Sequence, residues 1–194
     1  MTPIETVFCA LMGSEFYRLD IGFPPAYRND AKLLVLGSLP GKRSIAQSQY
    51  YGHPRNLFWQ ILSSYIGLAA DDEYGDRLQA ALDTKIALWD VMASAQRPGS
   101  LDSSIERDSV QVNPIPDLIA NLPQLNTVIL NGGAAMRYFK QAGFDELCRS
   151  LGVAVEHLPS TSPAHAALSY EMKAAQWQRV IDKALSQDTK RISR

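Results

Sequence analysis

One stretch of the sequence decides the fold: Lys32-Leu33-Leu34-Val35-Leu36-Gly37 is a short apolar run that ends in glycine. A run of this kind is typical of a β-strand buried on both faces, as in a parallel sheet that helices cover. Three similar runs follow, at Ile86-Ala87-Leu88-Trp89, Thr127-Val128-Ile129-Leu130 and Val153-Ala154-Val155. We therefore expect four central strands.

Helical patterns lie between and before these runs. Apolar residues at helical spacing occur twice, in an opening segment at Ile4, Val7, Phe8 and Leu11 and after the first strand at Phe58, Ile61, Leu62 and Tyr65. The alternation predicts an α/β fold, a three-layer α/β/α domain with a central, mainly parallel four-stranded sheet. Ligands of such folds bind beyond the carboxyl ends of the strands. Four loops would meet there, at residues 37–56, 90–102, 131–133 and 157–165.

Length and composition limit the organisation of the chain. Its 194 residues, of which 46% are hydrophobic, suffice for one well-buried domain and are too few for two. We expect a single domain over residues 1–194, with a core at about 22–186 and a frayed tail at 187–194. The chain lacks a run of about 18 apolar residues and a basic leader, so we expect a cytoplasmic protein without a membrane partner. We also expect a monomer.

The cysteines and the net charge argue against several other classes. Cys9 and Cys148 are far apart and lack partners at metal or redox spacing, which predicts buried thiols and no metal or other cofactor. A net charge of −1 differs from the broad positive field of a protein that coats nucleic acid. Local basic groups remain at Lys42, Arg43, Arg55, Lys173 and Arg179. Lys190, Arg191 and Arg194 lie in a tail that is better explained as a frayed, solvated chain end.

The first predicted loop superficially matches a phosphate-binding P-loop. It begins with Gly37-Ser38-Leu39-Pro40-Gly41-Lys42-Arg43-Ser44. A P-loop needs four residues between its glycines and a Ser or Thr directly after the Lys. Here three residues separate the glycines and Arg43 follows Lys42, so the sequence argues against a nucleoside-triphosphate site.

A wider stretch resembles the first motif of the uracil-DNA glycosylase superfamily, in which a Gly-x-x-Pro-Gly turn precedes His-Pro-x-Asn-x-Phe-Trp. The matching residues are Gly37-Ser38-Leu39-Pro40-Gly41 and His53-Pro54-Arg55-Asn56-Leu57-Phe58-Trp59. Leu88-Trp89-Asp90-Val91 leads into Arg97-Pro98-Gly99-Ser100-Leu101-Asp102-Ser103-Ser104-Ile105, which resembles the pocket-lining loop of the hypoxanthine-DNA glycosylase branch. This Gly-Ser-Leu-Asp loop is what favours that branch.

Two later segments extend the resemblance. Leu130-Asn131-Gly132-Gly133-Ala134-Ala135 resembles the third strand of the family and the helix after it. Leu158-Pro159-Ser160-Thr161-Ser162-Pro163-Ala164 resembles the second, DNA-facing motif of the same branch. The resemblance runs from about Gly22 to Trp177, with all four pieces in family order and at predicted strand ends.

The resemblance implies a monofunctional DNA glycosylase of base excision repair. Such an enzyme flips a base out of the duplex and hydrolyses its N-glycosidic bond. The expected partner is DNA containing deaminated bases, with hypoxanthine the first substrate and uracil the second. A base slot needs ring faces, close backbone approach and a few polar groups. The residues expected there are Gly37, Ser38, Leu39, Pro40, Gly41, Tyr51, His53, Phe58, Ser100 and Asn131. Two of these residues also have a structural explanation. Phe58 is equally typical of an aromatic in a helix core, and Asn131 fits a turn residue after a strand.

The first-motif turn departs from the family at one position. Relatives usually place an Asn or Asp there to hold the attacking water, whereas this chain has Leu39. Leu cannot hold water, and the hypoxanthine branch implies that the role passes to Asn56, at the start of the next helix. We therefore expect Asn56 to be catalytic. Its structural alternative is a helix N-cap, which Asn favours.

The second motif departs as well. Uracil-specific relatives place a leaving-group histidine before Pro-Ser, where this chain has Leu158, and His157 lies one residue early on the other face of the strand. A structural role therefore explains His157 better. The residues expected to contact DNA are Lys42, Arg43, Ser44, Ser160, Ser162 and His165. For both Ser160 and Ser162 helix capping is the alternative, and His165 replaces an Asn common in this branch.

Two rival functions remain at this stage. The Leu39 and Leu158 departures allow a DNA damage-recognition protein that kept the fold and lost catalysis, although Asn56 argues against it. The other rival is a hydrolase of small-molecule nucleotides. Cleavage of a free nucleoside compared with a duplex oligonucleotide separates that rival from a glycosylase.

Overall fold

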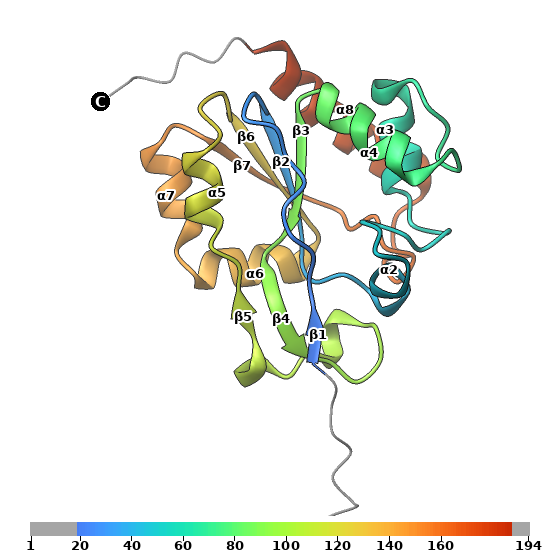
Figure 1. Cartoon of the computed structure of the whole chain (residues 1–194), viewed down its shortest axis with the longest axis vertical. Helices are drawn as coiled ribbons and strands as arrows, with labels where there is room; N and C mark the ends of the chain where they lie inside the picture. Colours follow the sequence, from blue (N-terminus) through green and yellow to red (C-terminus); the bar gives the residue numbers. More distant parts are fainter. Residues whose placement is uncertain (1–18, 188–194) are drawn as a thin grey trace, which may run out of the picture.

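The computed structural model describes residues 19–187 (Figure 1). Its central sheet has four parallel strands in the order β3-β2-β6-β7. Their bounds are Leu33–Gly37 for β2, Ile86–Asp90 for β3, Thr127–Asn131 for β6 and Ala154–Leu158 for β7. All four overlap the predicted apolar runs, so the predicted fold class is confirmed, although β7 begins one residue after the start of its run and continues to Leu158.

Helices cover both faces of this sheet (Figure 1). One face carries α3 (Phe58–Ile66), α4 (Tyr74–Asp83) and α8 (Tyr170–Ser186), and the other carries α5 (Ile115–Ala120), α6 (Gly133–Gln141) and α7 (Phe144–Ser150). A short helix, α2 (Lys42–Gln47), lies within the first rim loop, where only a loop was predicted. The resulting three layers explain why every residue of β2, β3 and β6 is buried.

The strand register places the carboxyl ends of the strands at one rim. Gly37 at the end of β2 pairs with Asp90 at the end of β3, and Asn131 at the end of β6 pairs with Leu158 at the end of β7. The predicted motifs therefore come together at this edge, as the general rule for open α/β sheets requires.

A second, smaller sheet was not predicted. It is antiparallel, in the order β1-β4-β5, with bounds Leu19–Ile21, Met92–Gln96 and Gln111–Val112. Only Val91 separates β4 from the end of β3, so this sheet extends from the same rim (Figure 1). Two 3₁₀ turns, η1 (Asp102–Ser104) and η2 (Arg107–Ser109), lie between β4 and β5.

Some expectations fall outside the described residues: the opening helix at 4–11, the burial of Cys9 and the fraying of most of the tail. Cys148 is buried, as predicted. Within residues 19–187, the helices are all too short or too polar to cross a membrane.

Candidate active site

A buried arginine holds the first-motif turn. The Arg97 side chain is 0% exposed and forms an ion pair with Asp20 of β1 at 2.8 Å. Its guanidinium also donates to the backbone carbonyl oxygens of Leu39 at 3.5 Å and Pro40 at 2.5 Å. The Leu39 side chain packs into the core near Gly22. The turn is therefore fixed from behind, with the Leu39 side chain directed away from solvent.

Ser38 joins this turn to the Gly-Ser-Leu-Asp loop. Its hydroxyl donates to both carboxylate oxygens of Asp102 at 2.9 Å. Burial raises the pKa of Asp102, while the Ser38 hydrogen bond and the charge of Arg97 oppose that rise. Ser100, predicted to lie in the pocket, is exposed on the same loop, and its role stays a prediction.

Asp90 lies at the rim, at the end of the edge strand β3. It is 4% exposed, and its Oδ2 is buried without a hydrogen-bond partner among the described residues. Its Oδ1 lies so close to the backbone of Gly37 that a Cβ at position 37 would overlap it. Gly37 is therefore needed for close approach, as predicted, but the group that approaches is this carboxyl group.

An aromatic pair lies beside Asp90. The rings of Tyr51 and Phe58 are stacked, with centroids 3.9 Å apart and planes at 30°. Phe58 is completely buried, and its contacts with Trp59 and Trp177 are edge-on. Phe58 is thus buried as a core aromatic, Tyr51 covers the ring face that a base would use, and stacking of a base on Phe58 stays a prediction.

The hydroxyl of Tyr51 ends in the same place as the carboxyl group of Asp90. It is buried without a hydrogen-bond partner among residues 19–187, and it would lie 3.4 Å from a Cβ at position 37. Burial, and then the charge of Asp90, raise the pKa of this phenol. The side chain of Asn131 lies near enough to oppose that rise, but it lacks the geometry of a hydrogen bond to this hydroxyl, which therefore has no partner among the described residues.

Asn131 connects the third strand to the second motif. Its Nδ2 donates to the hydroxyl of Thr161 at 2.9 Å, and its Oδ1 accepts from the Thr161 backbone N–H at 2.9 Å. The amide keeps one N–H and one lone pair for another partner. Binding of a base edge by Asn131 therefore stays a prediction, beside a structural role that the sequence did not indicate.

Asn56 stabilises the first turn of α3, although the N-cap residue of this helix is Leu57 and not Asn56. Its Oδ1 accepts a hydrogen bond from the backbone N–H of Phe58 at 3.0 Å, just before α3. The neighbouring Leu57 N–H donates to the carbonyl oxygen of Thr161 at 3.0 Å. The start of α3 is thus fixed to both motifs, and the catalytic role of Asn56 stays a prediction.

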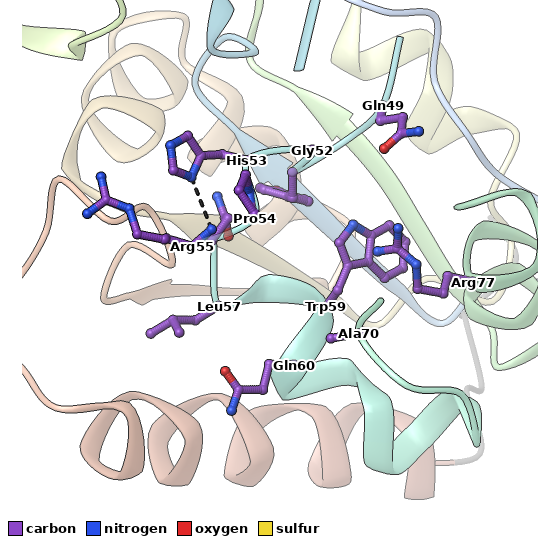
Figure 2. A pocket seen from close by; sticks show the side chains of 12 residues that line it. Gln49, Gly52, His53, Pro54, Arg55, Leu57, Trp59, Gln60, Ala70 and Arg77 are labelled. Carbon is purple, nitrogen blue, oxygen red and sulfur yellow. Dashed lines mark hydrogen bonds between the residues drawn. The ribbon is translucent and has the colours of Figure 1, made fainter. Parts of the chain in front are cut away.

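Asn56 also lines an open pocket of about 360 Å³ (Figure 2). The pocket lies over residues 49–57 and the start of α3, and its far wall is Trp59 with the guanidinium of Arg77 4.7 Å above the ring. Tyr51 lines it, whereas Gly37, Asp90 and Asn131 do not. In this structure the pocket therefore reaches Asn56 but not the polar atoms at the strand ends.

The predicted DNA contacts fall into two groups. Lys42 and Arg43 are exposed on α2. The pKa of His53 is lowered mainly by burial and, to a smaller extent, by the charges of Arg55 and Arg43. Ser44 is buried and accepts a hydrogen bond from Gly52 N–H at 3.0 Å. This gives Ser44 a packing role, and its DNA contact stays a prediction.

The second group lies on the loop after β7. Ser160 accepts a hydrogen bond from the N–H of Ser162, which accepts one from Ala164 N–H, so both hydroxyls stabilise the loop. The Nδ1 of His165 is buried without a partner among the described residues. Their contacts with DNA stay predictions. His157 is exposed and Leu158 buried, so these two do lie on opposite faces of the strand.

Lys173 is not the surface cation that the sequence predicts on the last helix. It is 2% exposed, and its Nζ donates to the carbonyl oxygen of His165 at 2.5 Å. It therefore holds the second-motif loop from inside and cannot reach a phosphate. Arg179 on the same helix is exposed.

The donor groups of this rim differ from those of a metal centre. Among residues 19–187, side chains of His, Cys, Asp and Glu do not gather in threes or more in a way that could hold an ion. The rim instead offers stacked rings, an open glycine backbone and buried polar atoms. These groups suit a flat heterocycle, so the fold and the rim define an α/β protein with a candidate binding site at its strand ends.

Comparison with known proteins gives the family. A family model described as the uracil DNA glycosylase superfamily matches residues 24–185, and the chain belongs to this superfamily. Two relatives are named hypoxanthine DNA glycosylase. The protein from Methanosarcina barkeri (strain Fusaro) is 37% identical over 145 residues, which are 74% of this chain and 87% of the relative. The protein from Methanosarcina acetivorans is 34% identical over 161 residues, which are 82% of this chain and 96% of the relative.

A solved structure agrees with this assignment. The solution NMR structure of a candidate uracil DNA glycosylase from Methanosarcina acetivorans matches with a TM-score of 0.72 and 32% identity. The match covers 86% of this chain and 99% of that one. The family predicted from the four motifs is therefore confirmed.

Proposed function

We propose that this chain is a monofunctional DNA glycosylase that removes deaminated bases from DNA in base excision repair, hypoxanthine first and uracil second. The observation that carries the proposal is the aromatic position on Phe58, which Tyr51 fills and which ends at buried, unpartnered polar atoms. A flipped base needs such a position. The similarity to two proteins named hypoxanthine DNA glycosylase supports this substrate.

The chemistry assigned to Asn56 uses its observed contact. The N–H of Phe58 occupies one lone pair of Oδ1 and so fixes the plane of the amide. The second lone pair can accept from a water molecule that attacks C1′ of the sugar. An oriented water and a carbonyl dipole near the positive charge that develops on the sugar both lower the barrier. The base leaves with the bonding electron pair and takes up a proton, and an abasic site remains.

The test is a panel of duplexes that each contain one lesion, analysed on a gel with and without alkali. The expected result is cleavage of the deoxyinosine strand only after alkali, at a rate that EDTA does not change. Nicking without alkali would show lyase chemistry and overturn the monofunctional assignment. Binding of lesions without any cleavage would favour the damage-recognition protein. Faster release from a free nucleoside than from a duplex would favour the small-molecule hydrolase.

The remaining assignments belong to the same proposal. DNA is the macromolecular partner, as membership of this superfamily implies. We further propose that the chain acts as a monomer and a single domain in the cytoplasm. Size-exclusion chromatography with light scattering tests the first of these directly.

A further inference from the structure

The starting observation is a carboxyl group that the protein leaves unsatisfied. A buried polar atom normally has a hydrogen-bond partner, because desolvation without one costs free energy. Asp90 Oδ2 lacks a partner among the described residues, and so does the hydroxyl of Tyr51 beside it. Two such atoms at one point of the rim indicate a place that is built to bind a further polar group.

Tyr51 shows where that group would lie. Its ring is stacked on Phe58, and its hydroxyl end reaches the backbone of Gly37 and the carboxyl group of Asp90. It also has a left-handed backbone, with φ at 54°, which is unfavourable for a residue with a side chain. A flat ring with a polar end thus already fills this space. A flipped base that stacks on Phe58 would place its own polar edge where the Tyr51 hydroxyl now lies.

We propose that Asp90, as a neutral carboxylic acid, binds the polar edge of the flipped base after Tyr51 has moved aside. This inference rests on the proposed function and adds a residue that recognises the base in that site. The carboxyl group would donate a hydrogen bond from one oxygen and accept one at the other.

The chemistry of the expected base fits this pair of contacts. Hypoxanthine carries a carbonyl oxygen, O6, next to the N1–H group. A neutral carboxylic acid offers an O–H donor and a carbonyl acceptor side by side, so it can bind both atoms at once. A carboxylate has only acceptors and would repel O6. Negative charge develops on the departing base, so the donated hydrogen bond becomes stronger as the glycosidic bond breaks.

The surroundings of Asp90 favour its neutral form. Burial and then the nearby charge of Asp102 on η1 raise the pKa of Asp90, the charge of Arg97 after β4 opposes them, and the net result is a pKa of about 7. The other titratable groups beside it are the phenols of Tyr50 and Tyr51. The neighbouring strand β2 contributes Gly37, which has no charge. A neutral acid that donates to a developing oxyanion is an established device in other enzymes.

Two readouts test the proposal. The first is the preference of the protein for a duplex with one 2′-fluoro-deoxyinosine, whose glycosidic bond resists cleavage, over the same duplex with a deoxyguanosine–cytosine pair at that position, whose guanine stays paired and stacked. We expect D90A to lower this preference about tenfold or more, and D90N to restore most of it, because an amide also donates and accepts. D108A, which removes an exposed carboxylate on η2, is the matched control and should have no effect.

The second readout is the pH dependence of single-turnover cleavage of a deoxyinosine duplex. Only the protonated acid can donate, so the wild-type rate should fall as the pH rises through about 7. The D90N rate should lack this fall, since its amide does not titrate. D90N therefore decides the question even if D90A does not fold.

The outcomes separate the inference from the function on which it rests. If D90A keeps the full preference for the lesion, or if D90N falls with pH as the wild type does, Asp90 does not bind the base. A wild-type protein that prefers the fluorinated lesion through Asp90 but cleaves none of the lesions would keep the inference and overturn the glycosylase. A wild-type protein without any preference for the lesion would overturn both.

Discussion

Asn56 accepts a hydrogen bond from the backbone N–H of Phe58 at 3.0 Å, so a single side chain both caps the first N–H of α3 and has the predicted catalytic role. The two roles differ in what they contribute. Capping stabilises the folded protein, whereas an oriented water stabilises the transition state.

Asn56→Ala should therefore change both stability and rate. We expect a loss of about 1 kcal/mol in the free energy of unfolding from the missing cap. We also expect cleavage that is slower by roughly 100 to 1000 fold per folded molecule, with lesion binding nearly unchanged. Thermal melts and single-turnover rates on one preparation measure the two effects. Asn56→Ser, which keeps a capping oxygen and removes the amide, is the matched control: a normal rate in both variants would limit Asn56 to capping.

The buried Arg97 should be essential for stability. Arg97→Ala leaves the carboxylate of Asp20 and the carbonyl oxygens of Leu39 and Pro40 without their donor inside the protein. Breaking a buried pair by removing one partner costs about 3–5 kcal/mol. Chemical denaturation should show this loss, with Arg107→Ala on exposed η2 as the control. An unchanged denaturation midpoint would mean that water replaces the guanidinium at this place.

The left-handed backbone at Tyr51 predicts an order of stability for two variants. Tyr51→Ala and Tyr51→Gly both lose the stacked ring, but only glycine adopts a φ of 54° without a steric cost. Tyr51→Gly should therefore be the more stable of the two by about 1 kcal/mol. Equal melting temperatures would show that the loop changes its backbone once the ring is removed.

DNA binding should depend only weakly on salt. The net charge is −1, and the exposed cations of the predicted contact region are Lys42, Arg43 and Arg55. We expect the logarithm of the binding constant to fall against the logarithm of the salt concentration with a slope of about −2 to −4, for about two to four neutralised phosphates. Fluorescence anisotropy over a series of potassium chloride concentrations measures this slope. A slope for eight or more phosphates would require a second basic surface.

The central sheet was predictable because its signal is local. Three of its strands, β2, β3 and β6, are mostly apolar runs that are buried on both faces, and the order of runs and helical patterns specifies the layers. The small sheet gives no such signal. In β1 the apolar Leu19 and Ile21 are exposed, while Asp20 between them is buried against Arg97. Only the position of Arg97, 77 residues away, explains that inverted pattern.

The site was predictable in its location and less so in its contacts. The motifs identified the rim and the residues around Asn56, but not that Asn131 binds Thr161 or that Tyr51 covers Phe58. Those contacts join segments that no short-range pattern relates. Asp90 had a weak signal, since an acidic residue directly follows a buried apolar run at the carboxyl end of a strand. Its importance depends on the unsatisfied oxygen, which only coordinates reveal.

Thr161 has a consequence for the order in which the protein assembles. It binds Asn131 and the N–H of Leu57, so it joins the second motif to the end of β6 and to the start of α3. A chain still being synthesised cannot make these contacts until residue 161 has left the ribosome. Pairing of distant segments is also slow compared with helix formation. Nascent chains that end before the second motif should therefore acquire helices early and remain unable to bind a lesion.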